Sequence, residues 1–448
     1  AAWVRGRVAD GWVYAGSDSY GYIKLADELR VHHRYALGPN EPLHFARVPG
    51  YPIFLALTKG GAPAGMNGGP GWDKIKRGQR WFDFFIALPL LFLLARRLGG
   101  PKAGLIALGI AAVFPFTVIF TAVALTESIS TTLTVAAIAP LILGARRPRT
   151  WFAVAGAMVG LATLVRPDGI LLASAFVPAI LLLRPNARRW RERAIVGALS
   201  LAGFLVAYGG WPVRNLADFG RPIWLGQHTN RFARPLDHYQ GYWSWMRTWC
   251  GGWECQTAPA TCFFNPPCVP SVAEYPAAAV DGGDLPTVEK LFAERARDGL
   301  SPAVSVGFQK LADARRARHP LQVLVKLPLE RAWHMWVARR DEVLPPNWRP
   351  WRQVTNRIAP HFRTLSFALL LALLLSGALL LLRRDTRGAA LVLLVPIVTR
   401  SLVLPFELYS MPRYAVEVMP LAFVLIAVAL ALARRDGAGH GEVIKSGG

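Results

Sequence analysis

Repeated apolar segments, most of them near 20 residues long, constrain this chain more than any other feature of its sequence. A transmembrane helix needs about 20 predominantly apolar residues. The candidate spans are 79–98, 102–120, 124–144, 151–165, 169–184, 193–212, 364–383, 388–405 and 414–434. The sequence therefore predicts an all-α polytopic membrane protein.

The composition supports a membrane protein and argues against other strongly basic classes. The chain has 448 residues, is 53% hydrophobic, has a mean hydropathy of +0.30 and carries a formal net charge of +23. A nucleic-acid-binding protein can be equally basic, but it would not carry repeated apolar segments of membrane-spanning length. Residues 1–8 contain two arginines and no apolar core, so no cleavable signal peptide is predicted.

Basic residues occur in every second connection between the predicted spans, and this alternation predicts the topology. Cytoplasmic connections of membrane proteins are enriched in Lys and Arg. The basic connections contain Arg96, Arg97 and Lys102; Arg146, Arg147 and Arg149; Arg184, Arg188, Arg189, Arg191 and Arg193; Arg383, Arg384 and Arg387; and Arg434 and Arg435. The other connections, including the two longest non-spanning segments, are therefore predicted to be extracytoplasmic.

This topology predicts five regions and settles one ambiguous segment. The regions are a first outer loop with surface helices at 1–78, six spans within 79–212, an extracytoplasmic domain at 213–363, three spans within 364–434, and a cytoplasmic tail at 435–448. Both ends of 151–184 are basic, so this segment is expected to form two short helices that turn at 166–169, where Pro and Gly occur. Because the outer loop comes first and the chain begins with Ala, a further span is expected to precede it.

Four cysteines fall within 19 residues of the predicted outer domain, with the spacing C-x4-C-x6-C-x5-C; they are Cys250, Cys255, Cys262 and Cys268. An even number of cysteines in an oxidising compartment predicts two disulfides, and three pairings are open. A structural zinc site is the alternative, but only the first interval has the close spacing that such sites use. We therefore expect disulfides that brace an aromatic loop, and no metal site.

A helix is predicted at roughly 320–339, with alternating apolar and basic faces. Its apolar residues are Leu321, Leu324, Val325 and Leu327, and its basic residues are Arg331, Arg339 and Arg340. This pattern is typical of a helix that lies on a bilayer surface.

Asp18 stands where the first helix of the outer loop is expected to begin. After it, Tyr22, Leu25, Ala26 and Leu29 follow at spacings of three and four residues, which predicts one apolar helix face. One interpretation of Asp18 is a helix N-cap. The other is a catalytic carboxylate held at a membrane surface.

Further polar residues occur at the outer ends of the predicted spans. Each has an ordinary interpretation: Glu127 could complement a helix dipole, Arg166 could pair with Asp168, Arg214 could anchor an interface, and Arg413 and Tyr414 could extend toward the headgroups. The topology nevertheless places distant residues on one face, namely Asp18, Arg47, Glu127, Arg166, Arg214, Glu407 and Arg413. Arginines bind phosphates bidentately and a carboxylate can act as a base, so this set suits an anionic, membrane-embedded substrate.

The chain resembles a known family in a series of short motifs. They are Asp18-Ser19-x-x-Tyr22, Arg47-x-Pro49-Gly50-Tyr51-Pro52, Gln79-Arg80, Thr126-Glu127-Ser128, Gly160 to Arg166-Pro167, Trp211-Pro212-x-Arg214-Asn215 and Pro412-Arg413-Tyr414. In these it is similar to the GT-C-fold glycosyltransferases that use polyprenyl-phosphate sugars, such as protein O-mannosyltransferases and the lipid A aminoarabinose transferase. The matching motifs lie within 17–220 and 405–430, and 225–360 matches nothing in the family.

The resemblance implies a reaction and roles for these residues. Asp18 is expected to be the general base of an inverting displacement, with Glu127 as a second acidic residue of the site. Arg47 is expected to bind the donor phosphate, together with one or more of Arg166, Arg214 and Arg413, beside Tyr414. No cofactor is expected, because the lipid-linked sugar is itself a substrate.

Two other functions remain open at this stage. A lipid flippase or transporter would prefer ionisable residues in the middle of helices, whereas here they occur at span ends. A non-catalytic subunit of a larger membrane complex could keep the same fold. The expected partners are a polyprenyl-phosphate sugar, membrane lipids and an acceptor of unknown identity, not nucleic acid. The expected location is the cell (inner/cytoplasmic) membrane, with the active face extracytoplasmic.

Overall fold

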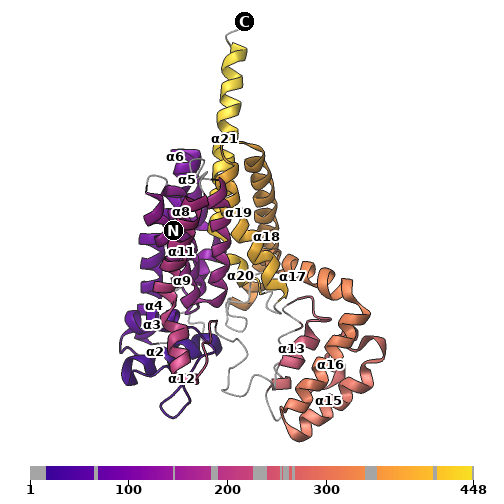
Figure 1. The fold of residues 1–448 in the computed structure, drawn as a ribbon. Coiled ribbons are helices and arrows are strands. Elements are labelled where there is room, and N and C mark those ends of the chain that lie inside the picture. The colour runs from indigo at the N-terminus through magenta and orange to yellow at the C-terminus, as the bar shows by residue number, and fades with distance from the viewer. Residues whose placement is uncertain are drawn as a thin grey trace. The chain divides into compact units, whose positions relative to one another are not determined.

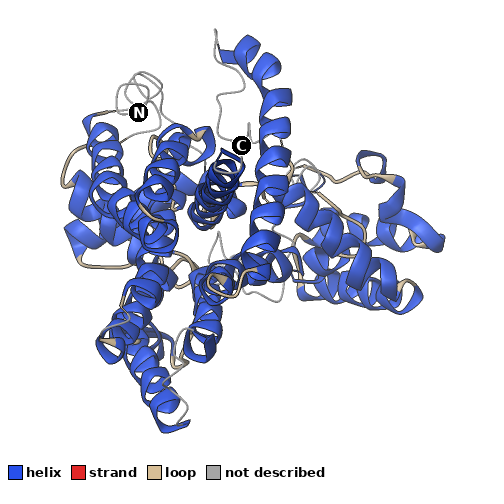
Figure 2. Ribbon diagram, turned by 90° about the horizontal axis from the view of Figure 1, so that it is seen from above, coloured by secondary structure: helices blue, strands red, loops and turns tan. Residues whose placement is uncertain are grey.

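The chain is almost entirely helical in the computed structural model (Figures 1 and 2). The structure describes residues 17–64, 69–144, 147–182, 190–225, 240–252, 255, 262–264, 268–338, 351–406 and 411–445, with the backbone alone at 17, 281, 351–359 and 435–445. Two compact units are present. Unit 1 comprises Ala1–Gly226, Arg339–Thr399 and Ala415–Gly448, and unit 2 comprises Gln227–Ala338 and Arg400–Tyr414.

Unit 1 begins with three helices, α2 (Ser17–His32), α3 (Gly50–Lys59) and α4 (Pro70–Phe82). Leu25 and Ala26 of α2 are fully buried, and Tyr22 and Leu29 are partly buried, so the predicted apolar face is confirmed. Helix α3 packs against α2 and contributes the buried residues Tyr51 and Leu55. The first loop is therefore a small helical layer that shares its apolar core with Ile129, Leu133 and Val159 of the predicted spans.

Every predicted span contains helical structure. The elements are η1 (Asp83–Ala87), α5 (Leu88–Gly99), α6 (Pro101–Val113), α7 (Pro115–Phe120), α8 (Glu127–Leu143), α9 (Pro148–Val165), η2 (Pro167–Ala175), α10 (Phe176–Leu182), α11 (Trp190–Tyr208), α12 (Gly210–Phe219), α18 (Trp351–Leu382), α19 (Arg387–Val403), η7 (Leu404–Phe406), α20 (Arg413–Val416) and α21 (Met419–Lys445). Helix α9 ends before Arg166, where the backbone becomes extended, so the predicted break in 151–184 is confirmed.

Among the described residues, three helices are long and apolar enough to cross a membrane: Pro148–Val165, Pro360–Leu382 and Arg387–Phe406. The pair α11 and α12, which bends by 50°, could form a fourth span, and several other apolar helices are shorter. The count of nine spans, the additional preceding span and the assignment of regions to membrane sides stay predictions.

Small residues let α9 and α11 approach closely. A Cβ on Gly156 would collide with the carbonyl oxygen of Ser200, and one on Gly160 would lie 2.8 Å from the carbonyl oxygen of Phe204. Small residues four apart favour this close packing between helices in membranes. Helix α8 packs against α9, and its side chains are buried from Glu127 to Ile142. This packing fixes the end of α8 that carries Glu127.

Unit 2 is built around an aromatic core. Its elements are α13 (Gln240–Met246), η4 (Val272–Glu274), η5 (Ala277–Gly283), α15 (Leu285–Asp298), α16 (Pro302–Arg318), η6 (Gln322–Lys326) and α17 (Leu327–Trp336). The ring of Tyr242 stacks on Phe263 with centroids 3.8 Å apart, and Trp245, Phe292 and Phe308 surround them. Two disulfides, Cys250–Cys255 and Cys262–Cys268, lie in this unit, so the disulfide prediction is confirmed and its pairing is resolved.

The prediction that Arg331 lies on an exposed basic face is wrong. Its side chain is buried, with an exposed fraction of 1%, and its guanidinium donates hydrogen bonds to three backbone carbonyls. Leu327 is also buried, whereas Leu321, Leu324 and Val325 are exposed. Leu321, Leu324 and Val325 therefore face outward, whereas Leu327 and Arg331 face the protein. Arg339 and Arg340 lie outside the described residues.

Candidate functional site

Asp18 and Arg47 form an ion pair at the start of α2. The Nη2 of Arg47 donates to Oδ1 of Asp18 at 2.9 Å, and Nη1 donates to the backbone carbonyl of Asp18 at 3.3 Å. The expected proximity of these side chains is therefore observed. Both remain accessible, with side-chain exposed fractions of 25% for Asp18 and 20% for Arg47.

Three residues hold the backbone around Arg47. The backbone N–H of Arg47 donates to Nε2 of His44 at 3.1 Å, and the hydroxyl of Tyr35 lies 3.1 Å from the carbonyl oxygen of Arg47. Arg214 donates to the carbonyl oxygen of His44 at 2.9 Å. Burial, with the charges of Arg47 and Arg214, lowers the pKa of His44 to about 4. His44 is therefore neutral at neutral pH and can accept the hydrogen bond from Arg47.

The ring of Tyr22 lies beside Arg47, and the pKa of its hydroxyl also responds to Arg166 and Glu127. The guanidinium carbon of Arg47 is 4.3 Å from the ring centroid, within cation–π range. Burial raises the pKa of Tyr22 above its usual value, and Arg47, Asp18, Arg166 and Glu127 all act on that pKa. The pKa of Tyr22 thus responds both to the Asp18–Arg47 pair and to the charges of Arg166 and Glu127.

A buried chain of contacts continues from Tyr22 to the segment before α8. The rings of Tyr22 and Tyr51 meet edge to face, with centroids 5.1 Å apart. The hydroxyl of Tyr51 donates to Oε1 of Gln79 at 2.7 Å, and Nε2 of Gln79 donates to the carbonyl oxygen of Val123 at 2.9 Å. Because Gln79 is fully buried, it joins α4 to the loop that leads to Glu127.

Arg166 is the centre of the second charged group. Its Nη1 donates to Oε1 of Glu127 at 3.1 Å and to the hydroxyl of Thr126 at 3.0 Å. Its Nε lies 3.2 Å from Oδ1 of Asp168 and 2.9 Å from Oε1 of Glu417. Glu127 and Glu417 are almost completely buried. The expected pair between Arg166 and Asp168 is therefore present, within a larger cluster.

Gly50 allows the chain after Arg47 to approach the end of α9. A Cβ on Gly50 would lie 2.6 Å from the carbonyl oxygen of Leu164, which is closer than side chains are found to pack. Pro49 caps the start of α3 directly before it. The Arg47-x-Pro49-Gly50 motif thus sets the loop of Arg47 against the helix end that leads to Arg166.

The remaining predicted residues are distributed as follows. Arg214 lies in unit 1, where its Nε is 2.6 Å from Oδ2 of Asp218. Arg413 and Tyr414 lie in unit 2, where the guanidinium carbon of Arg413 is 5.6 Å from the ring centroid of Tyr414. The prediction that they share one site with Asp18 and Glu127 stays a prediction. Glu407 lies outside the described residues.

The sequence interpretation missed several residues of this site. Glu417 lies within an apolar run, and an acidic residue at that depth was a usable signal. His44 and Tyr35 belong to no motif. Their hydrogen bonds to Arg47 involve only its backbone, and such contacts leave no pattern in the sequence. Tyr51 and Gln79 were recognised only as parts of motifs.

Comparison with known families gives one match within the chain. Residues 84–211 match the family described as Dolichyl-phosphate-mannose-protein mannosyltransferase. The matched range runs from η1 to the beginning of α12, and therefore includes Glu127 and Arg166 but neither Asp18 nor Arg47. No curated protein matches the chain.

The chain also matches solved structures over almost its whole length. The apo oligosaccharyltransferase of Archaeoglobus fulgidus is similar with a TM-score of 0.50 and 14% identity, over 99% of this chain and 50% of that one. ArnT of Cupriavidus metallidurans, solved with undecaprenyl phosphate bound, has a TM-score of 0.42 and 14% identity, over 98% of this chain and 77% of that one. The family match over 84–211 bears out the resemblance to glycosyltransferases that use polyprenyl-phosphate sugars, and the match to the oligosaccharyltransferase shows a similar fold alone.

Proposed function

We propose that this chain is a membrane glycosyltransferase that moves a sugar from a polyprenyl-phosphate donor to an extracytoplasmic acceptor. Its place is the cell (inner/cytoplasmic) membrane, with Asp18 on the outer face. The observation that carries the proposal is the Asp18–Arg47 ion pair, in which a carboxylate and a guanidinium 29 positions apart in the chain lie 2.9 Å from each other. Both groups remain accessible to ligands.

The proposed reaction is a displacement at the anomeric carbon with inversion. Asp18 accepts the proton of the acceptor hydroxyl while the acceptor oxygen forms a bond to the anomeric carbon. The bond between that carbon and the phosphate oxygen breaks, and its electron pair leaves with the polyprenyl phosphate. Arg47 stabilises the negative charge of the leaving phosphate. An ion pair with a guanidinium favours the ionised form of a carboxyl group, which is the form that can accept a proton.

Arg47 is better suited to the donor phosphate than Arg166. Arg166 already contacts Glu127, Asp168 and Glu417, and carboxylates repel a phosphate that approaches the same guanidinium. Arg47 contacts one side-chain carboxylate and lies beside an aromatic ring. We therefore assign phosphate binding to Arg47, with Arg214 as its neighbour, and assign to Arg166 the role of holding Glu127.

The proposal is tested with purified protein in lipid vesicles and a radiolabelled polyprenyl-phosphate mannose, the donor class that the family match suggests. Asp18→Asn keeps the size of the side chain and removes the base, so sugar release should fall by roughly 10²–10⁴-fold. Asp27→Asn is the matched control: Asp27 lies on the same helix and pairs with Nζ of Lys59 at 2.5 Å. It should leave release unchanged.

The alternatives predict different results. A flippase would move the labelled lipid between leaflets without releasing sugar, and a non-catalytic subunit would do neither. Equal release by the native protein and Asp18→Asn would show that Asp18 is not the base. If mannose is not released, the same comparison with other polyprenyl-phosphate sugars distinguishes a wrong sugar from a wrong function.

A further inference from the structure

One helix of unit 2 exposes a continuous apolar stripe. From Leu321 through η6 and α17, the exposed apolar positions follow three- and four-residue spacing; they are Leu321, Leu324, Val325, Leu329 and Trp333, each between 45% and 77% exposed. Lys326 and Glu330 are exposed as well. The opposite face is apolar as well, with Val323, Leu327 and Met335 buried in the protein. Large contiguous apolar surfaces of this kind mark sites of protein or membrane contact.

The same helix is attached to the end of a candidate membrane span. Nη1 of Arg331 donates to the carbonyl oxygen of Pro405 at 3.0 Å, and Nε1 of Trp336 donates to Oγ of Ser401 at 2.8 Å. Both acceptors belong to Arg387–Phe406, one of the helices long and apolar enough to cross a membrane. The apolar stripe therefore belongs to a helix that is held where this span ends.

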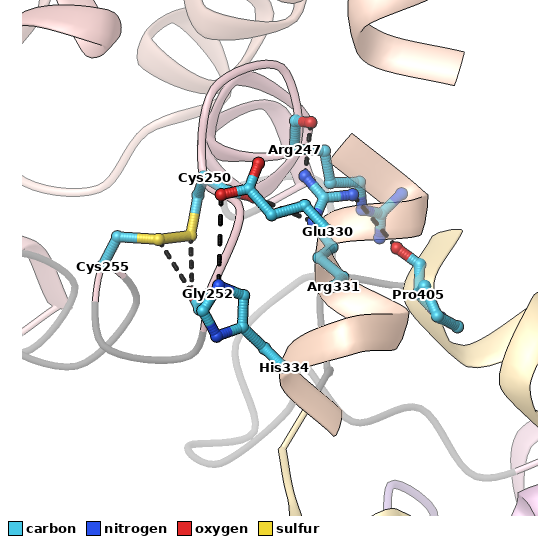
Figure 3. Close-up of a disulfide and its surroundings, with 8 residues drawn as sticks. All are labelled: Arg247, Cys250, Gly252, Cys255, Glu330, Arg331, His334 and Pro405. Carbon is cyan, nitrogen blue, oxygen red and sulfur yellow. Dashed lines mark hydrogen bonds and ion pairs between the residues drawn. A yellow bond between two sulfur atoms is a disulfide. The ribbon is translucent and has the colours of Figure 1, made fainter. Parts of the chain in front are cut away.

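Arg331 also fixes the rotation of the helix about its own axis. Its Nε donates to the carbonyl oxygen of Cys250 at 2.8 Å and its Nη2 to that of Arg247 at 2.6 Å, as Figure 3 shows. Cys250 is in turn bonded to Cys255. At about 100° per residue, Arg331 points away from Leu329 and Trp333. With the arginine fastened inward, the stripe is kept facing outward.

The end of the span exposes apolar side chains of its own within unit 2. Leu402, Val403 and Phe406 are between 41% and 55% exposed. A helix with a mean hydropathy of 2.1 is expected to present such residues to lipid. Unit 2 thus contains both the exposed apolar end of the span and the outward-facing apolar helix that is hydrogen-bonded to that end.

We infer that this stripe is a membrane-interface anchor, with Leu321, Leu324, Val325 and Leu329 inserted at the boundary between headgroups and acyl chains. Trp333 has the amphipathic ring that is enriched at that boundary. Lys326 is exposed next to Val325, at a position suited to the headgroups. The anchor would hold unit 2 at the membrane surface whether or not the chain is a glycosyltransferase.

Site-directed spin labelling of the full chain in lipid nanodiscs tests the inference. Leu324→Cys and Val325→Cys are labelled with an iodoacetamide nitroxide, which alkylates thiols and spares disulfides; no free cysteine is present among the described residues. Collisions with oxygen report lipid, and collisions with a water-soluble nickel chelate report water. Leu375→Cys, on the candidate span Pro360–Leu382, is the lipid control, and Val306→Cys, exposed on α16, is the water control.

The oxygen-to-nickel collision ratio at Leu324 and Val325 should exceed that at Val306 several-fold and stay below that at Leu375, because the ratio rises with depth in the bilayer. A ratio equal to that at Val306 would place the stripe in water and overturn the inference. Low collision with both reagents would show that protein covers the stripe, from a second copy or another chain, and would overturn it equally.

Discussion

Arg47 in unit 1 and Arg331 in unit 2 are both held by hydrogen bonds, but their partners differ. Arg47 contacts a side-chain carboxylate and a tyrosine ring, and its side chain is 20% exposed. Arg331 is 1% exposed and donates to three backbone carbonyls. Burial opposes the charge of Arg47, but Tyr22 and Asp18 raise its pKa above the usual value. Burial and Arg247 lower the pKa of Arg331 to about 10.

This difference separates a structural cation from one that can bind a ligand. Backbone carbonyls around Arg331 cannot leave without local unfolding, so its guanidinium is committed to the fold. The carboxylate of Asp18 lies on a side chain, and Arg47 can exchange part of that contact for a phosphate. The partner of an arginine, more than its burial, therefore indicates its role in this molecule.

The largest effect should come from Arg331→Met. Methionine is an unbranched side chain of similar length, but it leaves three backbone carbonyls without their donor. Each unsatisfied buried acceptor costs about 1–3 kcal/mol. We expect a loss of several kcal/mol, on the order of 3–5, measured by thermal unfolding in detergent. Arg47→Met is the matched variant, and it should lose about 1 kcal/mol or less. Equal losses in the two variants would contradict the comparison.

The second effect concerns donor binding. Arg47→Ala should raise the concentration of polyprenyl-phosphate mannose needed for half-maximal release by roughly 10²-fold, because it removes a charge-assisted contact with phosphate. Arg47→Lys should recover part of that loss, since it restores the charge but not the fork of donors. Arg30→Ala, at an exposed position on α2, is the control. Unchanged affinity in Arg47→Ala would remove Arg47 from the phosphate site.

A third effect is the pH dependence of the Arg47 loop. The pKa of His44 is about 4 in the folded protein and about 6.5 when unfolded, so the unfolded chain binds more protons between these values. Stability should therefore fall as pH drops from 7 to 5, by about 2 kcal/mol. Hydrogen exchange should become faster at residues 35–50 as the pH falls. It should not change at residues 247–252, because Arg331, which donates to the carbonyls of Arg247 and Cys250, stays charged. His44→Gln should flatten the dependence, and the same slope in that variant would assign it elsewhere.

The smallest effect should come from removing divalent metal. Because the proposed reaction assigns the phosphate charge to Arg47, adding a chelator such as EDTA should leave sugar release unchanged. Readdition of Mg²⁺ or Mn²⁺ is the control. Loss of release on chelation, with recovery on readdition, would show that a cation shares this role with Arg47.

The proximity of Asp18 and Arg47 could be predicted because topology and motif point to the same face. Both residues lie outside the apolar segments, and the alternating basic connections assign those parts to one side of the membrane. Sequence periodicity also predicted the buried face of α2. These features depend on local spacing and on charge, which a single sequence contains.

Other features depend on contacts between distant segments. The apolar spacing of 320–339 was correct, but spacing does not reveal which of two apolar faces meets the protein, so Arg331 was placed on the wrong side. Four cysteines allow three pairings, and only the structure shows that each bond joins near neighbours. Glu417 joins Arg166 across the fold, and no local pattern links them.

The shared position of Arg166 has a consequence for mutational tolerance. Asp168 and Glu417 both contact its Nε, so loss of either carboxylate leaves the guanidinium held by the other and by Glu127. The arginine itself has no such substitute. Single neutral replacements of similar size, Asp168→Asn or Glu417→Gln, should therefore be tolerated, whereas saturation mutagenesis should find almost no permitted residue at 166.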